Sequence, residues 1–177
     1  ITKPLTACAM MMLVERGLLS LDDPVQKHIP AFAGGDRPFV LLRHLLSHTS
    51  GLPDMVPKNL ELRRAHAPLS EFVADALTCP LLFPPGTGFS YQSAGVLLAA
   101  EIVEKISGRP LREFQQKEIF DPLGMKHSAL GLGTMELAST VRVGVGGTAA
   151  TNPREEEEYG GNSPYWRYMG HPWGGMH

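Results

Sequence analysis

The sequence has few cysteines, little net charge and no long hydrophobic run. Its two cysteines, Cys8 and Cys79, cannot form a disulfide framework, and their spacing is not that of a metal site. A formal net charge of -2 gives no electrostatic basis for binding nucleic acid or an anionic membrane. The apolar stretch 7–14 is too short to span a bilayer. These absences leave one ordinary globular domain, in which both cysteines are expected to be small buried side chains.

Apolar residues recur at helical spacing through most of the chain. The predicted helices cover approximately residues 2–16, 41–48, 69–77, 93–108 and 111–119. Pro4 is tolerated only in a first helical turn, which places Lys3 in the opening turn of the first helix. Gly17 and Gly108 supply stop signals, and Ser70 is a plausible cap.

The pattern weakens after Leu130. Three glycines at positions 144, 146 and 147 and the run 155–158 of glutamates predict exposed loop. Little of the chain before Thr140 has the pattern of a strand. The part of the chain that has a clear pattern is therefore predicted to be mostly helical, which is consistent with the helical half of an α+β fold.

Four stretches resemble the serine β-lactamase and penicillin-binding-protein family, including the class C β-lactamase-related hydrolases and esterases. They are Ile-Thr-Lys-Pro-Leu-Thr-Ala at 1–7, His-Leu-Leu-Ser-His-Thr-Ser-Gly-Leu-Pro at 44–53, Phe-Pro-Pro-Gly-Thr-Gly-Phe-Ser-Tyr-Gln-Ser at 83–93 and Asp-Pro-Leu-Gly-Met at 121–125. The first is similar to the family's Ser-x-x-Lys motif, and the third to the stretch that holds its Tyr-x-Asn motif. The four occur in the family's order, so together they are much stronger evidence than any one of them.

The resemblance implies an α+β fold of the β-lactamase/transpeptidase-like type, of which residues 1–177 form a partial domain covering mainly the helical part. The nucleophilic serine would be the residue directly before Ile1. The third family motif, Lys-Thr-Gly or His-x-Gly on a strand, is not found in the chain. Residues 172–175 resemble a stretch that precedes this motif in esterase-like members, so the last catalytic strand is expected downstream.

Lys3 and Tyr91 are the expected catalytic residues. A serine hydroxyl needs a neighbouring base at neutral pH, and residues three apart on a helix share one face. The positive end of the helix dipole disfavours a charged amine there, which favours Lys3 as a proton acceptor. The resemblance places the Tyr91 phenol beside the same site, where it can pass a proton between serine and leaving group.

Ser93 stands where the family often has asparagine, and it is the expected substrate-binding residue. Its hydroxyl could form a hydrogen bond with substrate or with Lys3, or it could cap the following helix. His44 and His48 are four residues apart and could share a helical face as metal ligands. The glutamate of a metalloprotease motif is missing and no third ligand is evident, which favours hydrogen-bonded structural histidines.

Three aromatic residues cluster near the end of the sequence and could line a pocket, although core positions are favoured: Trp166, Tyr168 and Trp173.

The expected function is that of a serine hydrolase fragment. The parent enzyme, of the carboxylesterase or D-amino-acid peptidase type, would cleave small esters, amides of D-amino acids or β-lactams through an acyl-enzyme, with esterase preferred, and the fragment alone would be inactive. No metal or organic cofactor is implied, and the sequence leaves the oligomeric state open. The alternative is a non-catalytic binding or scaffold protein on the same fold.

Overall fold

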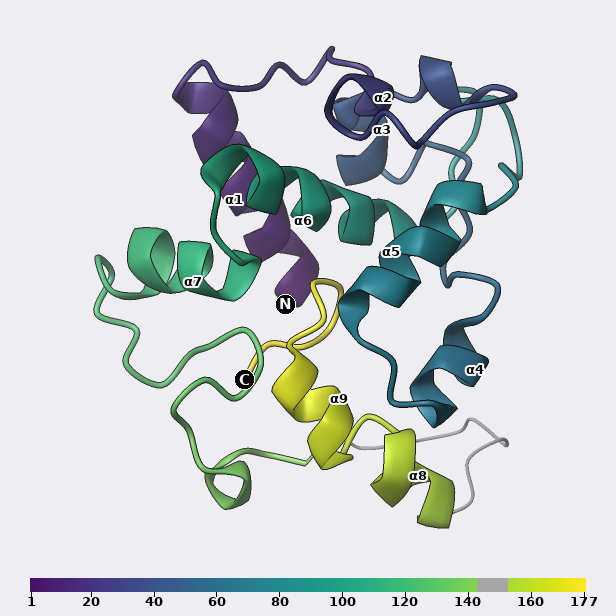
Figure 1. Cartoon of the computed structure of the whole chain (residues 1–177). Helices are drawn as coiled ribbons and strands as arrows, with labels where there is room; N and C mark the ends of the chain where they lie inside the picture. Colours follow the sequence, from purple (N-terminus) through teal and green to yellow (C-terminus); the bar gives the residue numbers. More distant parts are fainter. Residues whose placement is uncertain (143–152) are drawn as a thin grey trace.

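The fold is built around one buried helix. A computed structural model describes residues 1–142 and 153–177 (Figure 1), so the glycines at 144, 146 and 147 lie outside the described residues. Helix α6 (Ala94–Ser107) is apolar over most of its surface and buries nine of its residues. It contacts four other helices, α1 (Thr2–Glu15), α3 (Leu42–Leu46), α5 (Leu69–Thr78) and α7 (Leu111–Gln115). The first two turns of α6 are apolar on every side, as a central position requires, and the charged residues follow from Glu101 onward.

Glycines end the two longest helices, as the sequence predicts. Gly17 has φ +71°, and the N–H groups of Gly17 and Leu18 donate to the carbonyls of Val14 and Leu13. This is the Schellman arrangement, which satisfies the last carbonyls of α1. Gly108 follows α6 with φ +67°. Both stops confirm the predicted helix ends to within one residue.

The structure corrects one predicted helix end, one predicted helix cap and the predicted burial of one cysteine. The helix predicted over 41–48 ends at Leu46, because His48 adopts a left-handed backbone conformation. Ser70 does not cap α5, because the helix begins one residue earlier after Pro68. Cys8 is exposed, on the outer face of α1, whereas Cys79 is buried as expected.

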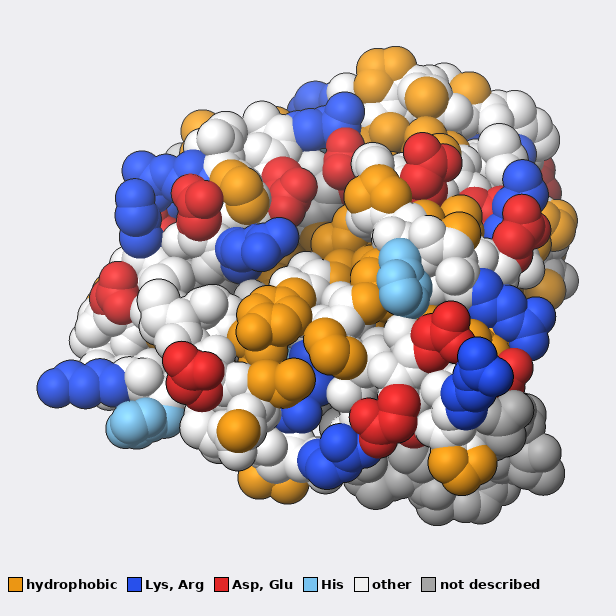
Figure 2. All heavy atoms as spheres, turned by 60° about the horizontal axis from the view of Figure 1, so that its bottom comes forward, with side chains coloured by type: hydrophobic (Ala, Val, Ile, Leu, Met, Phe, Trp, Pro, Cys, Tyr) orange, Lys and Arg blue, Asp and Glu red, His pale blue; other side chains and the backbone are white. Residues whose placement is uncertain are grey.

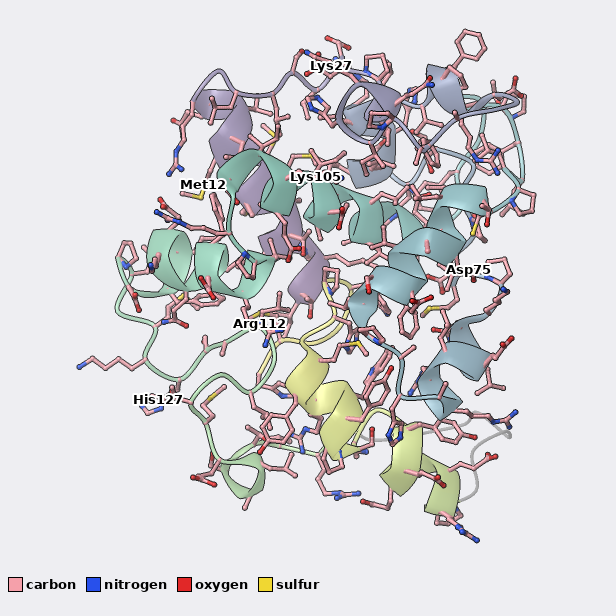
Figure 3. All side chains as sticks on the ribbon, in the orientation of Figure 1. Met12, Lys27, Asp75, Lys105, Arg112 and His127 are labelled. Carbon is pink, nitrogen blue, oxygen red and sulfur yellow. The ribbon has the colours of Figure 1, made fainter. Side chains whose placement is uncertain are left out.

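The remaining elements are short. They are α2 (Val25–His28), η1 (Arg37–Phe39), α4 (Asn59–Arg64), η2 (Gln116–Phe120), η3 (Leu137–Ser139), α8 (Pro153–Tyr159) and α9 (Pro164–Met169). The side chain of Asp75, which projects from α5 toward α4 in Figure 3, accepts a hydrogen bond from the backbone N–H of Lys58 at 2.7 Å. This bond ties the start of α4 to α5.

The glutamates at 155–158 belong to α8, so the loop predicted there is wrong. Glutamate is a good helix former, and two arginines of α4 form contacts with α8. Arg63 donates to the carbonyl of Tyr159, and Arg64 pairs with Glu155 at 3.3 Å. Tertiary contacts thus order a stretch whose charge alone indicated a solvated loop.

Within residues 1–142 and 153–177, pairing of extended backbone is limited to two isolated antiparallel bridges, Pro24 with Leu41 and Leu130 with Met176. The described chain is therefore helical, and the α+β class of the complete fold stays a prediction. No described helix combines the length and apolar character needed to cross a bilayer. Acidic and basic side chains alternate over the face shown in Figure 2, in keeping with the small net charge.

Candidate active site

Lys3 lies in the first turn of α1, where the sequence places it. Its Nζ is 4.5 Å from the centroid of the Tyr91 ring and donates to the carbonyl oxygen of Trp173 at 3.1 Å. The amine therefore faces an aromatic ring and a backbone dipole. Both contacts orient the amine. The structure thus brings together the two residues that the sequence singles out as catalytic, although their catalytic roles stay a prediction.

The C-terminal segment 171–177 forms the other wall beside Lys3. Thr6 Oγ1 donates to the Pro172 carbonyl at 2.8 Å, and the Met176 N–H donates to Thr2 Oγ1 at 3.2 Å. These bonds fix the segment along the buried side of α1, so both ends of the chain meet in Figure 1. The stretch that resembles the approach to the third motif is therefore part of the site.

Tyr91 is held on an extended segment between a turn and α6. The turn at 84–88 is closed by a bond from the Thr87 N–H to the Pro84 carbonyl, and the Gly86 N–H joins it to the Thr49 carbonyl. The Tyr91 side chain keeps 54% of its surface exposed, so its phenol is accessible from solvent. The amine of Lys3 lies over the face of this ring, the geometry of a cation–π contact.

Gln92 is fully buried and joins the Tyr91 segment to the loop after α3. Its Nε2 donates to the carbonyls of His44 and Leu45 at 3.1 and 3.2 Å, and its Oε1 accepts from Ser50 Oγ at 2.5 Å. A buried amide is stable only when such partners are present. Gly95 makes room for it, since a Cβ there would lie 2.7 Å from the Gln92 amide.

Gly51 holds the loop after α3 close to the segment that precedes the 84–88 turn. Its φ is +82°, and its carbonyl accepts from the Leu82 N–H at 2.7 Å. A Cβ at this position would lie 2.3 Å from the Phe83 carbonyl oxygen. Only glycine fits, because both the backbone conformation and the space exclude a side chain.

His44 in α3 and His48 in the loop that follows are both hydrogen-bonded within the protein. His44 Nδ1 accepts from the Leu41 N–H, and His48 Nδ1 accepts from the Gln92 N–H. Burial lowers the pKa of both rings, and the nearby Lys3 lowers that of His48 further. Within the described part of the chain, no three His, Cys, Asp or Glu side chains are grouped as a metal site requires. The arrangement is that of neutral structural histidines.

Ser93 is buried, and its hydroxyl is already engaged. Its Oγ donates to Asp54 Oδ1 at 2.7 Å, and the N–H groups of Ser93 and Ala94 both donate to the Asp54 carbonyl. The hydroxyl forms no capping bond with α6, so the capping role considered from the sequence is wrong. The structure places Ser93 as an anchor between α6 and the 51–56 loop, and its contact with substrate stays a prediction.

Trp166 and Trp173 are buried beside Phe72, as the favoured core interpretation has it, whereas Tyr168 is 54% exposed. A cavity of about 520 Å³ opens next to Trp166 and Gly174. Lys3 and Tyr91 do not line this cavity. The cavity is therefore separate from the surface formed by Lys3 and Tyr91.

Three contributors to the site could not be identified from the sequence. Asp54 follows a proline in a loop, and nothing in its neighbourhood indicates a bond to Ser93. Gln92 lies inside the tyrosine motif, but its burial depends on the fold. The Trp173 carbonyl is a backbone group 170 residues from Lys3, and backbone acceptors leave no sequence signal.

The chain matches the family model described as Beta-lactamase over residues 1–177. It is similar to Esterase EstB of Burkholderia gladioli, with 36% identity covering 71% of this chain and 36% of the relative. It is also similar to Penicillin-binding protein 4* of Bacillus subtilis, with 35% identity covering 72% of this chain and 29% of the relative.

Two solved structures extend the comparison. A D-stereospecific amidohydrolase from Streptomyces sp. superposes with a TM-score of 0.64 and 30% identity, covering 73% of this chain and 42% of that one. D-amino acid amidase from Ochrobactrum anthropi SV3, complexed with L-phenylalanine amide, gives a TM-score of 0.76 and 26% identity over 99% of this chain and 49% of that one. The chain spans less than half the length of each of these four proteins. On the match of the family model over all 177 residues, the chain belongs to the β-lactamase family.

Proposed function

We propose that this chain carries the proton-transfer half of a serine hydrolase active site. The observation that carries the proposal is the meeting of Lys3, Tyr91 and the Trp173 carbonyl at the start of α1. Family membership and relatives named as esterases and amidases support it. The complete protein would have the α+β fold, with residues 1–177 as part of its helical portion.

The nucleophile in this proposal is a serine directly before Ile1. Such a serine is three positions before Lys3, so extending α1 by one turn would place hydroxyl and amine on one helical face. The serine oxygen attacks the substrate carbonyl while its proton passes to Lys3 or Tyr91. The same proton is then delivered to the leaving alcohol or amine, and water releases the acyl group in a second round.

The substrate class we propose is a small ester or amide, with an ester preferred because of the likeness of residues 172–175 to esterase-like members. The 177-residue chain alone would not turn over substrate, because it contains neither that serine nor the third motif. The rival proposal of a non-catalytic protein depends on Ser93 in place of asparagine. The bond between Ser93 and Asp54 gives this residue a structural role that is compatible with either proposal.

The test is kcat/KM of the full-length protein on an activated ester. Lys3→Ala keeps the helix, because alanine is the best helix former, and should lower kcat/KM by about 10²–10⁴-fold. Tyr91→Phe should also lower it, while His44→Ala should cost mainly stability. Full activity of Lys3→Ala together with inhibition by a zinc chelator would replace the serine mechanism with a metal one. An inactive parent protein would favour the scaffold.

A further inference from the structure

His48 contacts the Tyr91 segment through its backbone carbonyl, its Nδ1 atom and its ring. Its carbonyl oxygen accepts from the Ser90 N–H at 3.0 Å, and its Nδ1 accepts from the Gln92 N–H at 3.2 Å. Its ring packs on the Tyr91 ring at a centroid distance of 4.7 Å and an angle of 42°. One residue therefore binds the backbone on both sides of Tyr91 and supports the ring between them.

The backbone of His48 adopts a left-handed conformation that makes this arrangement possible. Its φ is +61°, a value uncommon for residues other than glycine. The loop can hold it there because Gln92 and Gly51 fix the residues on either side. In this conformation both the carbonyl oxygen and the ring of His48 contact the segment that contains Tyr91.

We propose that His48 is a positioning residue that holds the Tyr91 phenol in place beside Lys3. The inference rests on the proposed function, because it gives Tyr91 the proton-transfer role. Tyr91 is more than half exposed, so part of its ring faces solvent and is not held by the protein. Lys3 lies over the ring at 4.5 Å, and His48 supports it from the loop after α3. Removing one of these two supports leaves the phenol free to change rotamer.

The ring must be neutral for this task. Nδ1 accepts a hydrogen bond from a backbone N–H only when it carries no proton. Burial and the charge of Lys3 both lower the pKa of His48, against a smaller opposing effect of Asp54. Burial, the larger of these two effects, keeps His48 in the form that accepts from the Gln92 N–H.

The experiment compares kcat and KM in the full-length enzyme. His48→Gly removes every side-chain contact while tolerating the left-handed backbone. His48→Asn also suits this backbone and can keep an acceptor near the Gln92 N–H, although it lacks the ring. The matched control is His44→Ala, because His44 also accepts a backbone N–H through Nδ1 and also has a pKa lowered by burial, but it has no ring contact with Tyr91.

The expected result is a fall in kcat of about 10- to 100-fold for His48→Gly, with KM within a factor of about three, since small displacements of a catalytic group have effects of this size. His48→Asn should recover part of kcat. If His48→Gly and His48→Asn both keep the kcat of His44→Ala, His48 is structural only. Loss of activity in Lys3→Ala and Tyr91→Phe alongside that outcome would leave the proposed function standing. Unimpaired Lys3→Ala and Tyr91→Phe would instead remove the basis of both proposals.

Discussion

His171 should make the stability of this chain fall steeply as the pH drops from 7 to 5. Its side chain is buried between the rings of Trp166 and Trp173, at centroid distances of 4.2 and 4.9 Å. Burial, with Arg63 as the largest charged contribution, lowers the pKa of His171 from 6.5 to about 3. In the unfolded chain the ring is solvated and titrates near its ordinary value.

Between these two pKa values the unfolded state binds about one more proton than the folded state. Stability from neutral His171 is therefore fully present above pH 6.5 and is lost as the pH falls toward 3. Each pH unit in this window corresponds to about 1.4 kcal/mol. The descent from pH 6.5 to pH 5 should therefore cost about 2 kcal/mol of unfolding free energy through this residue.

The assay is urea unfolding of the chain at several pH values from 7.5 to 5, followed by tryptophan fluorescence. His171→Phe keeps an aromatic ring between the two tryptophans and removes the titration. It should flatten the pH dependence by about 2 kcal/mol across the window, whatever its effect at pH 7.5. His44→Phe, at a less buried site, should flatten it less. An identical slope in His171→Phe and the parent chain would show that His171 titrates normally, and the burial argument would fail.

Two further predictions concern the scaffold of the site. Gly51→Ala should destabilise the chain by more than about 2 kcal/mol, because the new Cβ would meet the Phe83 carbonyl oxygen and the left-handed backbone would be strained; thermal unfolding beside Gly35→Ala, where the Cβ has open space, measures the difference due to crowding. Gln92→Leu should cost about 1–3 kcal/mol for each buried partner left unsatisfied, chiefly Ser50 and the His44 carbonyl. Equal stability of Gln92→Leu and the parent in chemical unfolding would contradict the assignment of Gln92 as the link between the two loops.

The order of motifs in the sequence anticipated that Lys3 and Tyr91 lie close together. Glycine stops at Gly17 and Gly108 also marked the ends of the two longest helices, because a left-handed residue is needed there and glycine adopts it freely. These features depend on local chemistry, which a sequence records directly.

The parts that could not be predicted depend on contacts between distant residues. Nothing local to the glutamates of α8 signals that Arg63 and Arg64 lie nearby. The left-handed backbone of His48 and the burial of Gln92 both follow from the way two loops meet. Ser93 appeared to be a cap or a substrate contact, since its partner Asp54 lies 39 residues earlier in the chain.

The most direct test of the central claim is covalent labelling with a fluorophosphonate probe, followed by mass spectrometry of the modified peptide. The account predicts one adduct in the full-length protein, on a serine directly before Ile1, and loss of that adduct in Lys3→Ala. The 177-residue chain alone should remain unlabelled. Stoichiometric labelling of the chain at Ser47, Ser50 or Ser90 would contradict the account, because the nucleophile would then lie elsewhere and Lys3 would not be its base.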